Sequence, residues 1–394
     1  MSKKQEYIKE AQGRLKAVAT ELDEAFPERG NVIRGALTAL LAGEHVLLLG
    51  PPGTAKSLLA RKVADAVSKD SFFEILLTKF TAPEEVFGPV SFSRLKQDKY
   101  ERMLAGYAAT KKFWFLDEIF KSSSAILNSF LTAMNERKFH NGGQPVDLPL
   151  AMVVAASNEY PQDESLKALY DRFSFKFWVD YISDRDQVAR LLTNGGVGEL
   201  HASLDLDDLH VLQAAVCEME LSDTIINTLL DVKAAVEQEG FVASDRTWVK
   251  AVKIIKARAV LSGRNQVIPS DLLALSDVLW KEHKDRDKLN TVIGNAADPY
   301  AARAVALIDG IRTAMGELPD FSLLENGTQQ KTEHITKISQ VNTQVASRLD
   351  AAKEALEESP DNEEIKKVVE LAEKSIKQIT EQMNKAAFYR PVRS

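Results

Sequence analysis

A glycine-rich turn near residue 50 ends in a lysine and a serine, a combination that can bind phosphate groups. It reads GPPGTAKS over residues 50–57, directly after the apolar run VLLL and at the start of the helical pattern SLLARKVADAV. Glycines let the backbone turn tightly with its N–H groups inward, and the following helix N-terminus adds partial positive charge. Lys56 would supply a full charge to the β- and γ-phosphates of a nucleotide, and the Ser57 hydroxyl can ligate Mg²⁺. The predicted nucleotide contacts in this loop are Gly50, Pro51, Pro52, Gly53, Thr54, Ala55, Lys56, Ser57 and Leu58.

One residue of this loop departs from the general phosphate-loop pattern. Ala55 occupies the position before the lysine, where glycine is usual. Because alanine tolerates helical angles, we expect Ala55 to be helical and to start the following helix one residue earlier. On its own, such a loop could also be a plain turn, so its partners along the chain decide the interpretation.

Two adjacent carboxylates follow an apolar run further along the chain. The segment FWFLDEI places Asp117 and Glu118 at the C-terminal end of a predicted strand, the edge of an open α/β sheet where ligands bind. Asp117 would hold Mg²⁺ through its water shell, and Glu118 would orient and polarise the attacking water. A strand that merely ends in solvated acids is the alternative. The phosphate loop disfavours it, because a bound phosphate needs a cation and the cation needs a carboxylate.

Three further polar residues could complete a site for phosphoryl transfer. Asn158 ends the strand-like segment VVAASN, where a neutral amide could hydrogen-bond the γ-phosphate or the lytic water. Phosphoryl transfer also needs cations against the charge that develops on the equatorial oxygens, commonly an arginine. Arg172 lies just before a strand in ALYDRF, and Arg246 starts a helix in SDRTW. From the residues alone, either arginine could be only a surface ion-pair partner.

The elements that must position these residues alternate between strands and helices from about residue 26 to residue 180. Such alternation predicts a parallel sheet covered by helices, an α/β fold. Several of the strand-like runs are apolar without alternation, as expected when both faces of a strand are covered. The candidate strands are VLLLG (46–50), FFEILLT (72–78), FWFLDE (113–118), AMVVAAS (151–157) and FSFKFWV (173–179).

Two irregular segments interrupt this alternation, and a third ends it. Residues 138–149 carry Gly142 and Gly143 between extended-type residues, which predicts a β-hairpin. Residues 81–99 form a second irregular stretch, and the NGGVGE run at 194–199 is typical of a domain linker.

Beyond that linker the apolar spacing is helical. It predicts helices over 222–239, 245–262 and 269–284, with Ser244 and Ser270 as N-terminal caps. From about residue 298 a heptad-like seam predicts an antiparallel helical hairpin packed on neighbouring helices. The seam comprises Ile335, Ile338, Val345, Leu349, Ala352 and Leu356, then Ile365, Val368, Ala372, Ile376, Ile379 and Met383. We therefore expect three domains: a nucleotide-binding domain (1–193), a small all-α lid (200–285) and a C-terminal helical region (286–394).

Composition limits the class of protein and its surroundings. The net charge of −7 gives no basic footprint, which disfavours sequence-independent attachment to nucleic acid or to an anionic membrane. No stretch approaches the roughly 18 apolar residues that span a bilayer. The single cysteine, Cys217, is expected on a buried helix face rather than in a disulfide or metal site, and a reducing cytoplasmic location is expected.

Seven segments, taken in order, resemble the MoxR family of AAA+ ATPases, and within it the RavA branch, over about residues 26–285. They are GPPGTAKS, FTAPEEVFGPVS, FWFLDEI, ILNSFLTAMNERKF, AASNEYP, LYDRF and SDRTWVKAVKIIKARAVLSGR. The string FGPVS together with LYDRF and SDR is the most specific part, and this branch tolerates an alanine at the position of Ala55.

The resemblance implies an AAA+ αβα core in a hexameric ring, with ATP and Mg²⁺ bound between subunits. By this resemblance Asn158 matches sensor 1, Arg246 matches sensor 2, and Arg172 matches the arginine finger that reaches into a neighbour's site. Residues 81–99 match the helix-2 insert, and residues 138–149 match the hairpin before sensor 1; both commonly line the pore. The adenine is expected to pack on Val32 and Ile33, although apolar residues there could equally belong to the core.

Family members work as chaperone-like motors, typically with a partner that carries a von Willebrand factor A domain. This chain has no recognisable domain of that type, so the partner would be a separate protein. RavA-type proteins also carry a β-rich insertion that docks a decarboxylase. Residues 286–394 are expected to be helical only, which puts binding of that decarboxylase in doubt.

The leading hypothesis is a ring ATPase that converts hydrolysis into remodelling of a protein client. A nucleic-acid-stimulated motor is a second hypothesis, since a pore could be lined by Lys79, Arg94, Lys96, Lys99 and Lys138. Against it, the acidic chain lacks the basic, aromatic-interleaved groove that such proteins use. An ATP-gated scaffold that recruits a partner through the C-terminal hairpin is a third, and a metal-chelatase subunit is possible by family kinship.

Overall fold

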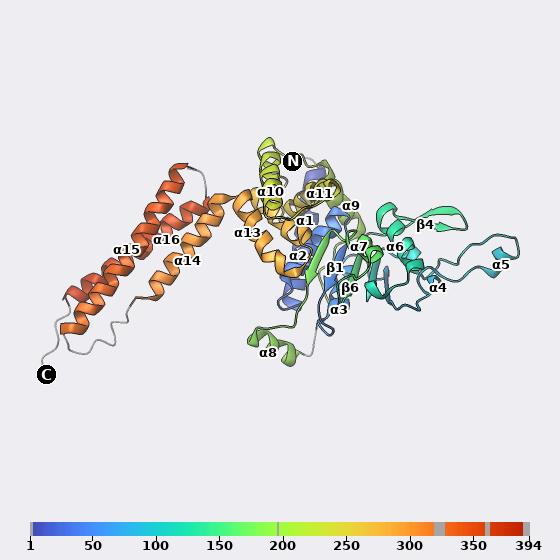
Figure 1. The fold of residues 1–394 in the computed structure, drawn as a ribbon, viewed down its shortest axis with the longest axis horizontal. Helices are drawn as coiled ribbons and strands as arrows, with labels where there is room; N and C mark the ends of the chain where they lie inside the picture. Colours follow the sequence, from blue (N-terminus) through green and yellow to red (C-terminus); the bar gives the residue numbers. More distant parts are fainter. Residues whose placement is uncertain (1–2, 195–196, 319–327, 359–362, 389–394) are drawn as a thin grey trace. The chain divides into compact units, whose positions relative to one another are not determined.

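The computed structural model describes residues 3–194, 197–318, 328–358 and 363–388 (Figure 1). Contacts between residues divide the chain into two compact units, one that ends at Ile293 and one that begins at Gly294. The predicted lid segment therefore falls in the same unit as the nucleotide-binding segment. The division into three domains stays a prediction.

A parallel five-stranded sheet forms the centre of the first unit and confirms the predicted α/β fold class. Its strands are β1 (Val46–Leu49), β2 (Phe72–Leu76), β3 (Phe113–Asp117), β6 (Met152–Ser157) and β7 (Phe175–Trp178). They lie in the order β2-β3-β6-β1-β7, so the chain passes between non-neighbouring strands through crossover connections. Every residue of β1 and β6 is buried, because these central strands are covered on both faces. Their carboxyl ends carry the loops that contain the predicted site residues.

Helices pack around this sheet. They are α1 (Lys3–Ala25), α2 (Gly30–Ala42), α3 (Lys56–Asp65), α6 (Ser124–Glu136) and α7 (Glu164–Tyr170). Helix α3 contacts β2, β3 and β6, whereas α2 packs against β7 and the lid helix α11 (Asp245–Leu261). The short 3₁₀ turns η1 (Ala108–Thr110) and η2 (Ile119–Lys121) flank β3.

The predicted β-hairpin is confirmed and lies beside the insert at one end of the first unit (Figure 1). Strand β4 (Lys138–Asn141) pairs antiparallel with β5 (Gln144–Asp147) around two glycines with left-handed φ angles. The insert contains two short helices, α4 (Pro83–Phe87) and α5 (Phe92–Leu95). The Asn141 side chain accepts a hydrogen bond from the Arg102 N–H (2.6 Å) and donates one to the Arg102 carbonyl (3.1 Å). Arg102 follows the insert and forms a β-bridge with Val90 inside it, so the hairpin and the insert are joined through Arg102.

The segment after the sheet is helical, with one correction to the predicted boundaries. Helices α8 (Arg185–Asn194), α9 (Leu206–Glu218) and α10 (Asp223–Gln238) precede α11, and the Ser244 hydroxyl caps α11 as predicted. The expected helix over 269–284 is wrong: the chain forms the 3₁₀ turn η3 (Pro269–Leu275), helix α12 (Ser276–Leu279) and the turn η4 (His283–Asp285). Ser270 is not a cap, because the turn already begins at Pro269 and the Asp271 carboxylate accepts the Ile268 N–H (2.9 Å).

The prediction that Cys217 is buried is also wrong. Its side chain is exposed, near the C-terminal end of α9. The buried face of that helix carries Leu209, Leu212 and Val216. One residue further along a helix turns the side chain by about 100°, so Cys217 points away from the core.

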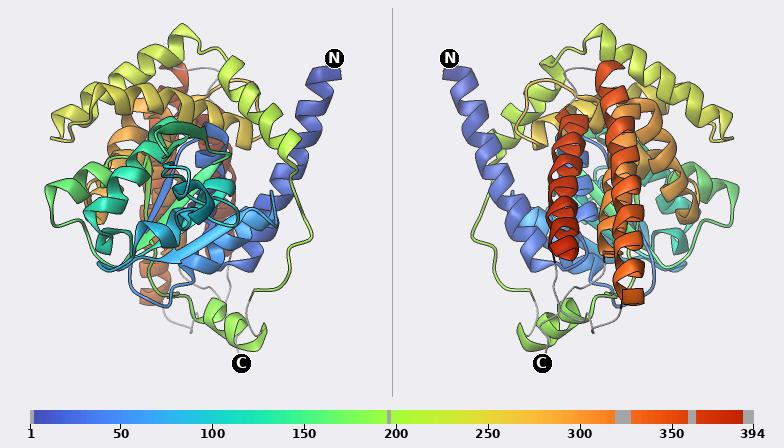
Figure 2. Two further views of the ribbon diagram at one scale, coloured as in Figure 1. Left: turned by 90° about the vertical axis from the view of Figure 1, so that its right-hand side faces the viewer. Right: turned by 90° about the vertical axis from the view of Figure 1, so that its left-hand side faces the viewer.

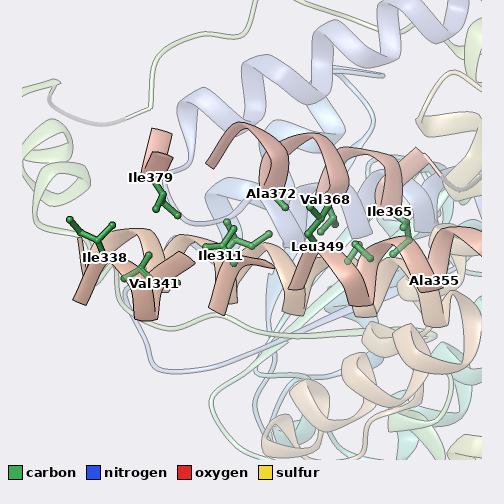
Figure 3. Packing of buried hydrophobic residues seen from close by; sticks show 13 residues of the cluster. Ile311, Ile338, Val341, Leu349, Ala355, Ile365, Val368, Ala372 and Ile379 are labelled. Carbon is green, nitrogen blue, oxygen red and sulfur yellow. The ribbon is translucent and has the colours of Figure 1, made fainter. Parts of the chain in front are cut away.

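The second unit is a bundle of three helices, α14 (Pro299–Gly316), α15 (Thr328–Glu358) and α16 (Glu363–Phe388), reached through α13 (Arg286–Ala297). Figure 2 shows α15 and α16 side by side, and both also contact α14. Most of the predicted seam lies in the core of this bundle, as Figure 3 shows. Ile335 is the exception, because 37% of its surface is exposed. The link SPDN and the residues after Phe388 lie outside the described part of the chain.

Candidate nucleotide site

The phosphate loop connects β1 to α3, at the carboxyl end of the sheet. Helix α3 begins at Lys56, so the expectation that Ala55 extends this helix is wrong. Ala55 has φ 62° and ψ 27°, a left-handed conformation that side chains disfavour. The usual glycine at this position would adopt it without strain. The loop geometry therefore demands a left-handed residue whether or not the sequence supplies glycine.

Gly50 is required for a different reason, which is close packing against the neighbouring strand. Its φ is 140°, and a Cβ atom built there would overlap the carbonyl oxygen of Val179. The Val179 N–H donates to the Leu49 carbonyl (2.7 Å) and holds the two segments together. Any larger residue at position 50 would push the loop away from the end of β7.

Lys56 lies at the end of the loop, and 8% of the residue surface is exposed. It donates to the Gly50 carbonyl (2.9 Å) and the Pro51 carbonyl (2.7 Å), and lies 3.5 Å from Asn158 Oδ1. Burial lowers the pKa of this lysine, and the negative charges of Asp117 and Glu118 oppose that change. The charge therefore sits where the loop, the acidic pair and Asn158 meet.

Three predicted residues meet at the ends of β3 and β6. The Asn158 amide nitrogen donates to Glu118 Oε1 (2.7 Å), and Asp117 Oδ1 accepts the Glu118 N–H (3.0 Å). Glu118 has a left-handed backbone (φ 52°), which turns the chain sharply after the strand. Its second oxygen, Oε2, is buried without a hydrogen-bond partner, although Lys121 Nζ lies 3.3 Å away. Lys121 was not predicted; its position three residues after Glu118 was the available signal.

Mg²⁺ fits the donors at this edge of the sheet. Ser57 and Asp117 offer a hydroxyl and a carboxylate, and hard divalent cations prefer such oxygen ligands. Burial raises the pKa of Asp117, and the negative charge of Glu118 adds to this effect, so a cation there would offset the cost of the ionised form. Among the residues that the structure describes, no three His, Cys, Asp or Glu side chains gather as a metal site.

Arg172 and Arg246 line a second cavity of about 290 Å³, between the end of α7 and the start of α11. None of Lys56, Asp117, Glu118 and Asn158 lines it. Arg172 Nε is buried without a hydrogen-bond partner, and Arg246 donates to Asn135 Oδ1 (3.3 Å). The basic side chains that line this cavity are Arg172, Lys176, Arg246, Lys250 and Lys281, against the single acid Asp171. The structure brings the two arginines to each other rather than to the phosphate loop of the same chain.

Lys176 was missed, although it is the one charged residue in the strand-like run FSFKFWV. Its ammonium donates to the carbonyls of Phe173 (3.3 Å) and Val278 (3.1 Å), while Trp280 Nε1 donates to the Lys176 carbonyl (3.1 Å). Burial lowers its pKa to about 8. These bonds fasten the end of α12 to the loop that carries Arg172.

An aromatic stack, also missed, joins the loop after Asn158 to the end of the lid. Tyr160 stacks on Trp178 (ring centroids 6.3 Å apart), and Trp178 stacks on His283 (4.4 Å). The Tyr160 hydroxyl is 3.2 Å from His283 Nδ1 and accepts the His283 N–H (3.1 Å). Trp178 is the last residue of β7 and pairs with Leu49, the residue that directly precedes the phosphate loop. The stack therefore connects the end of the lid segment to both loops.

Val32 and Ile33, the predicted adenine contacts, lie in α2 with exposures of 6% and 0%. Both serve core packing, and their contact with adenine stays a prediction. Beside them, Arg29 is a buried cation that sequence reasoning missed; its guanidinium donates to the Asp180 carbonyl after β7. Burial lowers its pKa, and its charge contributes to lowering that of Lys56.

Comparison with known protein families gives two matches that together cover most of the first unit. Residues 13–219 match the MoxR domain described from MoxR-vWA-beta-propeller ternary systems, and residues 224–293 match an AAA lid domain. The first match spans the phosphate loop, the acidic pair, Asn158 and Arg172. The second spans Arg246.

Similar proteins come from archaea and bacteria. An uncharacterised protein of Methanocaldococcus jannaschii is 34% identical over 325 residues, which cover 82% of this chain and 85% of that protein. The chaperone MoxR1 of Mycobacterium tuberculosis is 26% identical over 67% of this chain and 74% of its own length. The crystal structure of a putative ATPase from Cytophaga hutchinsonii superposes with a TM-score of 0.60 at 20% identity, over 73% of this chain and 96% of that one, and shows the fold alone. In the described part of the chain, no helix has the length and apolarity to cross a membrane.

Proposed function

Because this chain belongs to the MoxR family of AAA+ ATPases, we propose that it hydrolyses ATP with Mg²⁺ in a hexameric ring and uses the energy to remodel a protein client. The RavA branch is the proposed position within the family. The similarity to a chaperone of Mycobacterium tuberculosis supports a chaperone-like role.

One observation carries the proposed chemistry: Lys56, Asn158 and Glu118 form a continuous chain of contacts at the carboxyl edge of the sheet. In this proposal Lys56 and the loop N–H groups bind the phosphates, and Ser57 and Asp117 hold the Mg²⁺, which would neutralise charge on the β- and γ-phosphates. Glu118 orients and polarises the water, and Asn158 fixes the direction of that carboxylate. The Oε2 of Glu118 makes no hydrogen bond and pairs with Lys121 at 3.3 Å, and in this proposal it accepts a proton or a hydrogen bond from the water.

The ring arrangement would supply the remaining positive charge from the next subunit. Arg172 and Arg246 share a basic cavity that no residue of the phosphate loop lines. Within one chain, the two arginines are therefore separate from the residues proposed to bind the nucleotide. We assign both arginines to the nucleotide of a neighbouring subunit, with Arg172 as the finger. The buried, unpartnered Nε of Arg172 supports this assignment, since an anion would satisfy it.

The insert favours a protein client over nucleic acid. Exposed apolar side chains lie in it and directly beside it: Phe92 and Leu95 inside the insert, and Phe80 (94% exposed), Tyr100 and Met103 in the flanking residues. Two of its basic residues that could have faced nucleic acid already have local partners: Arg94 pairs with Glu101 (3.2 Å), and the Lys96 ammonium lies over the Phe92 ring. Stimulation of ATP hydrolysis by DNA or RNA that disappears at raised salt would instead support the nucleic-acid motor.

The proposed partner is a separate protein with a von Willebrand factor A domain. The family description names ternary systems in which a MoxR domain, such a domain and a β-propeller occur together. Co-purification of this chain with the product of a neighbouring gene that encodes such a domain would test the partnership.

The chemistry is tested by Glu118→Gln, which keeps the size and the hydrogen bond from Asn158 but removes the charge. We expect nucleotide to bind with Mg²⁺ as in the wild type while ATP turnover falls by about a hundredfold or more. The matched control is Glu136→Gln, an exposed acid at the end of α6, which should leave turnover unchanged. Turnover at the wild-type rate in Glu118→Gln would remove Glu118 from its proposed role.

A further inference from the structure

A cavity of about 440 Å³ lies between α2 and the lid, on the flank of the sheet. We call it the α2–lid cavity. Residues of α2, α11, η3, α12 and α13 line it, together with Phe175 at the start of β7. Phe175 pairs with Val46 at the amino end of the sheet, whereas the phosphate loop follows Leu49 at the carboxyl end. The α2–lid cavity is therefore separate from the nucleotide site and shares no lining residue with the cavity of Arg172.

Four arginines and two aspartates line the α2–lid cavity, and two of the arginines already neutralise the acids. Arg264 makes two hydrogen bonds to the Asp271 carboxylate (2.7 and 2.6 Å). The Arg286 Nε donates to Asp277 Oδ1 (2.6 Å). With both acids occupied, the remaining two arginines leave the cavity with excess positive charge.

Those two arginines face the cavity from different elements. Arg34 lies on α2. Among the described residues its ion pair is a 3.5 Å contact with Asp23, between side chains that are about 40% exposed, and such a pair contributes little stability. Arg258 lies on α11 and is half-buried, and its side chain makes no hydrogen bond or ion pair with any described residue. Burial first, and then the charge of Arg34, lower the pKa of Arg258, and the charges of Asp271 and Asp277 partly oppose this change. Two guanidinium groups thus line one cavity whose two carboxylates are already hydrogen-bonded to other arginines.

We propose that the α2–lid cavity is a binding site for a small molecule that carries a diphosphate group, held between Arg34 and Arg258. A planar guanidinium binds phosphate oxygens through two parallel N–H groups, and one arginine on each wall suits two linked phosphates. The cavity has the volume of ordinary small-molecule sites, and the side chains of Asn31, Ser270 and Asn290 add uncharged hydrogen-bonding groups. Because the ligand bridges α2 and the lid, its binding holds the lid against the core.

The test uses the full chain with Lys56→Ala, so that the phosphate loop loses its principal cation. Pyrophosphate is titrated at constant ionic strength and its binding followed by calorimetry. We expect one saturable site per chain, weakened about tenfold or more by either Arg258→Met or Arg34→Met, as for the loss of one charge-assisted hydrogen-bonded pair. Lys256→Met, which removes a charge from the same helix outside the cavity, is the matched control and should leave the affinity unchanged.

Two further arms separate the possible sources of binding. ADP is titrated in the same Lys56→Ala background: tighter binding than pyrophosphate identifies a nucleoside diphosphate as the ligand, and equal binding identifies the diphosphate group alone. Arg172→Met tests the other basic cavity. The proposal is overturned if Lys56→Ala abolishes saturable binding, or if Arg172→Met weakens it while Arg258→Met and Arg34→Met do not. Since the two arginines lie on separate helices, failure of one variant to fold leaves the other to decide.

Discussion

Lys176 offers a stability test in which burial of a single charge can be measured. Only 7% of the Lys176 surface is exposed. Its ammonium group donates hydrogen bonds to the Phe173 and Val278 carbonyls and lies over the Tyr170 ring. Burial lowers the pKa of this lysine from 10.5 to about 8. We consider Lys176→Met, which keeps the length of the side chain and removes the charge.

The sign of the effect follows from proton binding. Between about pH 8 and pH 10.5 the unfolded chain holds the lysine proton and the folded chain releases it, so this group makes the protein more stable as the pH rises. The two pKa values differ by an amount that corresponds to about 3 kcal/mol. Of this, about 2 kcal/mol is recovered between about pH 7 and about pH 9.5. In Lys176→Met this increment is absent.

Urea unfolding followed by tryptophan fluorescence measures the difference. All four tryptophans, Trp114, Trp178, Trp248 and Trp280, lie in the first unit, so the signal reports that unit alone. The free energy of unfolding of wild type minus variant should increase by about 2 kcal/mol from about pH 7 to about pH 9.5.

Lys79→Met, an exposed lysine of a loop, is the control for Lys176→Met and should show no such increase. A difference that stays constant within about 0.5 kcal/mol across this pH range would refute the burial of a titrating lysine. We also expect Lys176→Met to lower ATP turnover, since the lysine joins α12 to the Arg172 loop.

Three further outcomes follow from the geometry of the loops. Ala55→Gly should raise the free energy of unfolding by up to about 1 kcal/mol, because relief of left-handed strain exceeds the added chain entropy; a loss of that size in the same urea assay would contradict the strain. Gly50→Ala should weaken nucleotide binding about tenfold or more, because its Cβ would overlap the Val179 carbonyl; wild-type affinity in a fluorescent-nucleotide titration would rule this out. His283→Leu should destabilise the first unit by about 1 kcal/mol and alter the fluorescence emission of Trp178. An unchanged emission spectrum would show that His283 does not stack on Trp178.

The elements that depend on local pattern were predictable from the sequence. Uninterrupted apolar runs become β1, β3 and β6, because a strand covered on both faces needs no polar side. Lys56, Glu118 and Asn158 follow three such strands, and the carboxyl ends of parallel strands share one edge, so their meeting could be expected from their order alone. The Gly142–Gly143 hairpin and the Ser244 cap likewise depend on neighbours within a few residues.

Features that depend on contacts between distant segments were decided only by the tertiary structure. Ala55 is left-handed because the loop must close against the ends of two strands, and this requirement overrides the local preference of alanine. Cys217 is exposed because α9 turns a neighbouring face to α1 and α11. The shared cavity of Arg172 and Arg246 and the burial of Lys176 arise where the lid closes on β7, between residues about seventy to one hundred positions apart. The local sequence pattern around one of these residues cannot predict its distant partner, because the free energy of the contact comes from surfaces that meet only in the folded chain.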